Sequence, residues 1–306
     1  MKLLLTGAFS YSAAQLETLR TLGMEITFVQ DERVELNIDV SDFEAVVCNG
    51  LFLQNDITRF QKLRFLQVTS AGLDRVPLSY IQENGIVLCN ARGVYSAPMA
   101  EWALGGVLAL YKHINAFSEK QKNHTWEKDR EVRELQGDTA LIVGCGSVGT
   151  ECAVRFKAFG MQVLAADIVK PQSDAYDAYC PMQKIDNALE TADVIVLTLP
   201  LTEDTRGFFQ RERFSHCKNG AILVNIARGA VVKEKDLTDA LVSKKLGGAV
   251  LDVFADEPLP KESPLWDMEN VLITPHNSFV SPKNNERLFR VICQNLECYM
   301  KERTAK

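Results

Sequence analysis

Residues 139–167 read TALIVGCGSVGTECAVRFKAFGMQVLAAD, and the rest of the chain is arranged around this segment. An apolar run rich in β-branched residues, 139–143, leads into the glycine-rich hexapeptide GCGSVG at 144–149. A segment with helical spacing follows and ends at Gly160, before a second apolar run at 161–166. This order predicts a strand, a helix and a second, parallel strand.

The glycines of the hexapeptide suit a turn that binds a dinucleotide. Gly144 permits a tight turn, Gly146 lets the backbone approach a pyrophosphate, and Gly149 lets the helix pack closely on the strand. The free N–H groups at the start of the helix would face the anion. Three glycines can also form an ordinary loop, but here Asp167 follows the second strand, where an acid that binds the adenosine ribose is expected.

The composition favours two globular domains and excludes a disordered chain. The 306 residues are 46% hydrophobic, enough for two cores. With 34 Lys and Arg against 40 Asp and Glu and no basic block, nothing favours a nucleic-acid partner. The start MKLLLTGAFS is too short for a signal peptide, and no later segment has the length of a membrane span. We therefore expect a cytoplasmic protein with neither a membrane nor a nucleic-acid partner.

The cysteines indicate neither disulfides nor a metal site. There are eight, scattered and without CxxC pairs at metal-binding spacing. We expect them to be reduced and mostly buried in the core.

Short apolar runs alternate with amphipathic segments along the whole chain, which predicts an α/β fold. In the first part we expect a small parallel sheet without a phosphate loop, with strands at 2–7, 25–30, 45–50, 65–70 and 87–91 and helices at 12–23, 56–63 and 77–85. After the glycine-rich turn, further strands at 194–200, 222–227, 248–254 and 271–276 complete a doubly wound sheet.

Residues 97–122 predict the longest helix of the chain, which could bridge two lobes or form a dimer seam. Gly105 and Gly106 would each cost about 1 kcal/mol in an exposed helix interior, so we expect close packing there. The charged segment 123–137 is either a solvated loop or an arm that reaches a partner subunit, with Trp126 as its anchor. The last helix is expected at 282–300, long enough to return to the first lobe.

Three polar residues just past strand ends could carry chemistry, because ligands bind at the carboxyl ends of strands in open α/β sheets. They are Arg228, Glu257 and His276. Taken alone, each could be a surface charge, a solvated loop acid or a core imidazole. Together they suit proton transfer on an acid whose α-carbon carries the reacting oxygen: an arginine can hold carboxylate and carbonyl, and a histidine can give or take the hydroxyl proton. Glu257 would favour the protonated imidazole, which suits carbonyl reduction.

The order of these motifs resembles the D-isomer-specific 2-hydroxyacid dehydrogenase family. The matching motifs are GCGSVG, Asp167, NIARGA (225–230), LDVFADEP (251–258) and TPHNSF (274–279), with TSAGLD (69–74) and NARGVYSAPMAEWAL (90–104) in the first lobe. The resemblance implies a Rossmann NAD-binding domain at 97–279 inserted into a flavodoxin-like substrate domain made of 1–96 and 280–306. It also implies an NAD-dependent oxidoreductase, a homodimer, and an active site in the cleft between the lobes.

The resemblance further implies roles for single positions. Arg228, Glu257 and His276 fall on the family's catalytic residues, and the Ala71–Gly72 backbone on the site of the substrate carboxylate. Tyr95 and Phe279 resemble aromatic substrate contacts. The implied cofactor residues are Gly144, Cys145, Gly146, Ser147, Val148, Gly149, Asp167, Leu199, Pro200, Thr205, Ile226, Ala227 and Asp252. Among them Ser147 and Val148 would meet the pyrophosphate, Asp167 the ribose and Asp252 the nicotinamide carboxamide. Many family members carry histidine or valine in place of Leu199, which would face adenosine, so this difference does not touch catalysis.

We expect the substrate to be a small 2-oxo acid that is reduced to its D-2-hydroxy acid. The phosphoglycerate dehydrogenase branch carries arginines where this chain has CNGLF (48–52) and VTSA (68–71), so a phosphorylated substrate would lack its cation unless Arg59 or Arg92 supplied it. Leu51, Phe52, Tyr95 and Phe279 are the expected pocket neighbours, and aromatic walls favour small apolar side chains, although each could equally be core packing.

Three alternatives to this assignment stay open. Two are other reactions of the family, those of a phosphoglycerate dehydrogenase and of a glyoxylate or hydroxypyruvate reductase. The third is an NAD-sensing dimeric binding module without turnover. For the cofactor, Asp167 favours NAD over NADP, and Lys170, three residues on, weakens this preference.

Overall fold

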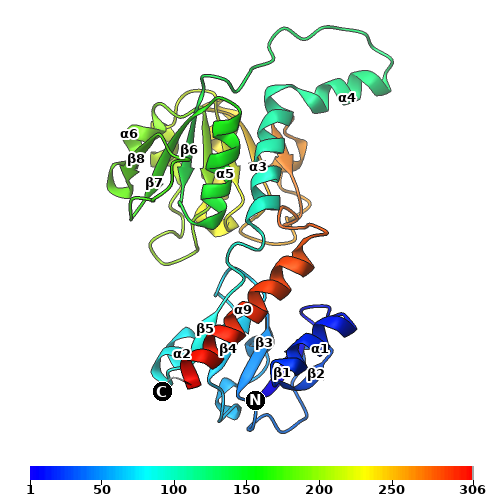
Figure 1. Cartoon of the computed structure of the whole chain (residues 1–306). Coiled ribbons are helices and arrows are strands. Elements are labelled where there is room, and N and C mark those ends of the chain that lie inside the picture. Colours follow the sequence, from blue (N-terminus) through cyan, green and yellow to red (C-terminus); the bar gives the residue numbers. More distant parts are fainter. Residues whose placement is uncertain (305–306) are drawn as a thin grey trace. The chain divides into compact units, whose positions relative to one another are not determined.

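The computed structural model describes residues 1–304, and the chain divides into two compact units (Figure 1). The first unit is Met1–Tyr95 with Ser281–Lys306, and the second unit is Ser96–Val280. Each contains one parallel sheet with helices beside it, which confirms the predicted α/β class.

Among its described residues, the first unit has a five-stranded sheet in the order β2-β1-β3-β4-β5. The strands are β1 (Lys2–Thr6), β2 (Glu25–Val29), β3 (Ala45–Cys48), β4 (Phe65–Val68) and β5 (Val87–Cys89). The central strands β3 and β4 are buried along their whole length, as parallel strands covered on both faces are. The helices are α1 (Ala13–Thr21), α2 (Leu78–Glu83) and α9 (Asn284–Thr304), with 3₁₀ turns η1 (Leu51–Leu53) and η2 (Ile57–Arg59).

Helix α9 joins the first unit although it comes from the far end of the sequence. Its side chains at Leu288, Ile292 and Leu296, each four residues from the next, are buried in the same core as β1. Asn295 donates a hydrogen bond from Nδ2 to Oε1 of Gln67 on β4, at 2.7 Å. Helix α9 therefore packs against the first sheet and shares its core.

One predicted helix of the first unit is wrong. Only the 3₁₀ turn η2 forms within residues 56–63, and it ends at Arg59, because the next residue, Phe60, has a φ of −88° and a ψ of 66°, which are not helical. Ile57, Phe60 and Leu63 are all buried in one core cluster, so core packing rather than helical spacing explains the apolar pattern. The five predicted strands exist, but each ends one to two residues earlier than expected, where the ladder pairing stops.

The second unit, which is fully described, has a seven-stranded sheet in the order β12-β11-β10-β9-β6-β7-β8. Its strands are β6 (Thr139–Val143), β7 (Gln162–Asp167), β8 (Ala178–Pro181), β9 (Val194–Leu197), β10 (Ala221–Asn225), β11 (Leu246–Leu251) and β12 (Val271–Ile273). The chain changes direction across the sheet between β6 and β9. Ligands bind beside such a reversal, at the carboxyl ends of the strands, and the glycine-rich turn follows β6 at this place.

Helices and short 3₁₀ turns connect these strands. They are α3 (Ser96–Tyr111), α4 (Ile114–Lys122), α5 (Ser147–Ala158), α6 (Ile185–Leu189), α7 (Arg211–His216) and α8 (Glu234–Val242), with η3 (Met182–Lys184), η4 (Gly229–Val231) and η5 (Pro264–Asp267). The edge strand β8 has no strong apolar pattern and was not predicted.

The prediction of a single helix at 97–122 is wrong, because the helix is interrupted at residues 112–113, between α3 and α4. His113 has a left-handed φ of 51°, and its Nδ1 lies 2.8 Å from Oδ2 of Asp129. Figure 1 shows α4 and the loop after it extending away from the sheet of the second unit. The longest described helix is α9 instead, with 21 residues.

Burial of the cysteines agrees only partly with expectation. All eight lie within the described residues and are free, but only Cys48, Cys152 and Cys217 are fully buried, and Cys298 is exposed. No helix within residues 1–304 combines the length and the apolar character needed to cross a membrane.

Candidate active site

The glycine-rich turn connects β6 to α5 with two glycines that no other residue could replace. Gly144 has a φ of +94°, and a Cβ there would lie 3.0 Å from the backbone N of Leu199. A Cβ at Gly149 would lie 2.1 Å from the carbonyl oxygen of Gly144, so α5 packs directly on the turn. At Gly146, the N-cap of α5, an added Cβ meets nothing within 4 Å. Its open surface and the free N–H groups of the first helical turn fit an anion such as a pyrophosphate.

Asp167, the last residue of β7, is tied to this turn. Its Oδ2 accepts a hydrogen bond from the backbone N of Cys145 at 2.5 Å, and its Oδ1 accepts one from Ile168 N at 2.6 Å. A carboxylate offers about four acceptor positions, so Asp167 can still accept from ribose hydroxyls. The exposed Lys170 follows three residues later.

The other predicted cofactor residues surround the same turn or follow β9 and β10. Thr205 Oγ1 donates to the carbonyl oxygen of Pro200 at 2.6 Å and accepts from Thr202 N at 2.7 Å, which folds the loop after β9 on itself. Thr198, which the sequence patterns did not identify, donates from Oγ1 to the carbonyl oxygen of Gly144. Ser147 and Val148 are half-buried in the first turn of α5, while Leu199, Ile226 and Ala227 are buried.

Arg228, Glu257 and His276 follow three neighbouring strands, β10, β11 and β12. The structure brings two of them into contact, because Nδ1 of His276 lies 2.9 Å from Oε2 of Glu257. These side chains are 40% and 39% exposed, so a ligand can reach them. Arg228 donates from Nη1 to the carbonyl oxygen of Ala227 at 2.9 Å. Histidine and glutamate are thus already arranged for proton transfer.

The loops that carry Arg228 and Glu257 are held against each other by close backbone packing. A Cβ at Gly229 would lie 1.8 Å from the carbonyl carbon of Phe254, so only glycine fits. Phe254 N donates to Oε1 of Glu257 at 3.1 Å, which leaves the other carboxylate oxygen for His276. Buried Asn225 accepts from Ala227 N at 3.1 Å and donates to the carbonyl oxygen of Arg228 at 3.3 Å. Both loops therefore rest on the buried ends of β10 and β11.

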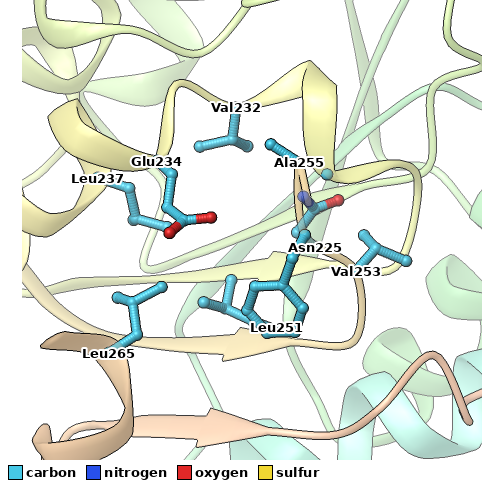
Figure 2. A pocket seen from close by; sticks show the side chains of 10 residues that line it. Asn225, Val232, Glu234, Leu237, Leu251, Val253, Ala255 and Leu265 are labelled. Carbon is cyan, nitrogen blue, oxygen red and sulfur yellow. The ribbon is translucent and has the colours of Figure 1, made fainter. Parts of the chain in front are cut away.

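A small pocket lies behind the turn at Gly229 (Figure 2). The space open to the centre of a water molecule is about 10 Å³. That is room for about one water, whereas ligand pockets measure several hundred Å³. Figure 2 shows the Glu234 carboxylate among apolar neighbours that include Leu237, Leu251 and Leu265. Burial and then the charge of Asp256 raise the pKa of Glu234. The pocket is therefore too small to be a substrate site.

In the first unit, the predicted carboxylate site at Ala71 and Gly72 is a braced turn after β4. Asn90 donates from Nδ2 to the carbonyl oxygen of Ala71 at 2.7 Å, and Ser70 donates from Oγ to that of Gly72 at 2.8 Å. Neither brace was identified from the sequence. The Tyr95 hydroxyl donates to the carbonyl oxygen of Thr69 at 2.5 Å, so it is used within the unit.

The other residues expected at the substrate side chain differ in their surroundings. Leu51 is 0% exposed, so its prediction as a pocket neighbour is wrong: it belongs to the core. Phe52 packs edge-on against Phe60, with ring centroids 5.4 Å apart. Arg59, at the end of η2, donates to the carbonyl oxygen of Leu36 at 2.9 Å and therefore holds the segment between β2 and β3. In the second unit, Phe279 is 39% exposed, and its ring meets that of His276 edge-on at 6.0 Å between centroids.

The chain is similar in sequence and in fold to known proteins. Residues 104–278 match the family model described as D-isomer specific 2-hydroxyacid dehydrogenase, NAD binding domain. A hydroxypyruvate reductase of Thermotoga maritima is 35% identical over 83% of each chain. An (S)-sulfolactate dehydrogenase of Chromohalobacter salexigens is 31% identical over 93% of each chain. A crystal structure of a D-isomer specific 2-hydroxyacid dehydrogenase family protein from Aeromonas salmonicida has a TM-score of 0.80 and 31% identity, covering 98% of this chain and 96% of its own.

Proposed function

Because this chain belongs to the D-isomer-specific 2-hydroxyacid dehydrogenase family, whose cofactor is NAD, we propose that it reduces a small unphosphorylated 2-oxo acid to the D-2-hydroxy acid. The family's members are oxidoreductases that act on CH–OH donors. The observation that carries the proposal is the contact of 2.9 Å between His276 Nδ1 and Glu257 Oε2 in the same unit as the NAD-binding turn.

The proposed mechanism divides the work between the three polar residues. When NAD is bound at the glycine-rich turn, the hydride would come from or go to its nicotinamide. Arg228 holds the carboxylate and carbonyl of the substrate in its planar fork. Since Nδ1 of His276 faces Glu257, Nε2 is the atom that gives its proton to the carbonyl oxygen during reduction and takes it back in the reverse direction. Glu257 fixes the orientation of the imidazole ring through its contact with Nδ1.

The cofactor residues of this chain fit the dinucleotide by their geometry. The open N-terminus of α5 would hold the pyrophosphate, and Asp167 would accept from the ribose hydroxyls. A 2′-phosphate would be repelled by Asp167, while Lys170 reduces this repulsion. We therefore propose a clear but incomplete preference for NADH over NADPH.

The preference for an unphosphorylated substrate rests on the charges available. Arg228 is assigned to the carboxylate and carbonyl, and Arg59 is engaged with a backbone carbonyl. Moving a phosphate from water to a place beside apolar groups such as Phe279 would cost roughly several kcal/mol of desolvation free energy if no cation paired with it. If a phosphorylated substrate proved best, exposed Arg92 would be the first candidate for its partner. The Ala71–Gly72 turn as carboxylate site, and Tyr95 as a side-chain contact, remain part of this proposal.

The test is oxidation of NADH and NADPH with a panel of 2-oxo acids. The panel holds pyruvate, branched 2-oxo acids, glyoxylate, hydroxypyruvate and phosphohydroxypyruvate. We expect the highest kcat/KM for pyruvate or a branched 2-oxo acid, with NADH. A best rate with phosphohydroxypyruvate would favour a phosphoglycerate dehydrogenase, and a best rate with glyoxylate or hydroxypyruvate would favour the corresponding reductase. NADH binding without turnover of any 2-oxo acid would indicate an NAD-sensing binding module instead of an enzyme.

A further inference from the structure

Asp252 is a buried carboxylate that holds both sides of the loop around His276. It follows β11 directly and is 1% exposed. Oδ1 accepts from Thr274 Oγ1 at 2.5 Å and from Asn277 N at 2.7 Å, and Oδ2 accepts from Ser278 N at 3.0 Å. The backbone N of His276 donates to the carbonyl oxygen of Asp252 at 2.8 Å. One residue thus receives four hydrogen bonds from a five-residue segment.

The backbone of His276 needs such support. Its φ is +52°, in the left-handed region that costs free energy for any residue with a Cβ. Conformations of this kind persist only where the surrounding contacts enforce them, and they concentrate at functional sites. The hydrogen bonds to Asp252 come from Thr274, two residues before His276, from His276 itself and from the two residues after it, so they enforce this conformation.

The imidazole ring is fixed from the same stretch of chain. Glu257 binds Nδ1 of His276, and Glu257 is itself held by the backbone N of Phe254, two residues after Asp252. The backbone and the ring of His276 therefore have a common anchor at the end of β11. A small shift of the loop would move the ring relative to Glu257.

We propose that Thr274 and Asp252 are positioning residues that aim His276 for acid/base catalysis. Of the three donors to the carboxylate, Thr274 supplies the hydroxyl, and the other two are backbone N–H groups. Removing this hydroxyl leaves a buried carboxylate oxygen with one partner fewer and loosens the loop. The catalytic consequence rests on the proposed function, whereas the effect on the loop does not. This role is separate from any contact of Asp252 with the nicotinamide carboxamide.

Thr274→Val is the sharpest test, because Asp252 is buried so deeply that replacing it risks unfolding the chain. Valine keeps the shape of threonine and lacks the hydroxyl. Thr274→Ser keeps the hydroxyl and serves as the rescue. Thr191→Val is the matched control, since the Thr191 hydroxyl bonds a helix carbonyl of the same unit, at Ala188. Thermal unfolding of every variant verifies that it is folded.

Two measurements are made on each variant. Amide hydrogen exchange, read by mass spectrometry on a peptide that spans 274–280, should be faster in Thr274→Val and unchanged in Thr274→Ser and Thr191→Val. With the best 2-oxo acid, kcat of Thr274→Val should fall about 10- to 100-fold, the loss expected for a misaimed catalytic group, while KM for NADH stays unchanged.

The outcomes separate this inference from the proposed function. Unchanged exchange at 274–280 in Thr274→Val would overturn it, and so would faster exchange with an unchanged kcat. A rise of KM for NADH with an unchanged kcat in Thr274→Val would also overturn it, since it would show that Asp252 acts only as a contact of the cofactor. If the wild-type chain reduced no 2-oxo acid, the proposed function would fail, and the exchange result alone would decide whether Thr274 holds the loop.

Discussion

His276 has two ring nitrogens in different surroundings, which is what an acid/base residue requires. Nδ1 is committed to Glu257, and the side chain is 40% exposed, so the other nitrogen can meet a substrate. The edge-on ring of Phe279 beside it limits how far the imidazole can turn. The pair therefore holds a proton donor in one orientation before any ligand arrives.

Replacing His276 by glutamine should lower turnover without loss of cofactor binding. We expect kcat to fall by about 10² to 10⁴, the usual contribution of general acid catalysis, because glutamine keeps a hydrogen-bonding side chain and cannot deliver the proton. NADH affinity, measured by fluorescence titration, should stay near the wild-type value. His216→Gln, on α7, is the control. Turnover of His276→Gln close to that of the wild type would remove this histidine from the mechanism.

Glu234 gives the second unit a pH dependence of stability that can be measured. Its pKa is raised above the ordinary value of 4.5 in the folded chain, first by burial and then by Asp256. The folded state therefore binds this proton more tightly than the unfolded state does. The stabilisation is complete below pH 4.5 and is lost as the pH rises through the raised pKa.

Glu234→Gln should remove that loss. Relative to the wild type, its free energy of unfolding should increase between pH 4.5 and neutral pH. The gain should be at most about 1 kcal/mol, since the group is only half-buried and solvent screens it. Urea unfolding at a series of pH values measures it, with the exposed Glu262→Gln as control. A difference from the wild type that does not vary with pH would contradict the assignment.

Single residues differ in how far the sequence could identify them. Arg228, Glu257 and His276 stand just past apolar runs, which is a local pattern, and two of them do meet. Thr274 and Asn90 have no such local pattern. Thr274 bonds a residue 22 positions away, and Asn90 bonds one 19 positions away. Only the folded chain shows those partners.

Among the helices and strands, α3 and α4 show where sequence periodicity fails. The segment between them contains neither glycine nor proline, so no local signal predicts a break. The break is enforced by later residues: Lys112 donates from Nζ to the carbonyl oxygen of Arg133, and His113 contacts Asp129. The turn after β6, in contrast, could be predicted from the local sequence. A Cβ at Gly149 would clash with Gly144 of the same short segment, so the need for glycine there is local.

The two adjacent glycines of α3 should respond in opposite directions to alanine. A Cβ at Gly106 would lie 2.4 Å from Cγ1 of Val250 on β11, while a Cβ at Gly105 would meet nothing within 4 Å. Gly105→Ala should therefore stabilise the chain by about 0.5–1 kcal/mol through helix propensity. Gly106→Ala should destabilise it by about 1–3 kcal/mol through overpacking. Urea unfolding compares the pair, and changes of the same sign in both variants would contradict the packing of α3 on β11.

For the chain as a whole, the α/β class followed from the alternation of apolar and amphipathic segments, and the structure confirms it. Strand order was beyond the sequence patterns, because parallel neighbours such as β6 and β9 lie more than 50 residues apart. The functional roles of the two units came from the family resemblance and not from the residues alone, since a sheet of either size could hold a substrate.

The whole chain should associate as a homodimer. Helix α4 and the loop after it expose several apolar side chains, among them Ile114, Phe117 and Trp126, the last 98% exposed. Large aromatic groups exposed together mark association surfaces. Sedimentation at micromolar concentration should give twice 34.2 kDa, and Trp126→Ala should weaken the association. A mass near 34.2 kDa for the wild type would contradict the dimer.

The most direct measurement of the proposed activity is the identity of its product. The purified chain is incubated with NADH and the best unphosphorylated 2-oxo acid, and the hydroxy acid formed is separated by chiral chromatography. We predict one D-2-hydroxy acid for each NADH consumed, and product formation by His276→Gln that is at least about 100-fold slower. An L-hydroxy acid, or NADH that binds without yielding any hydroxy acid, would contradict the proposal.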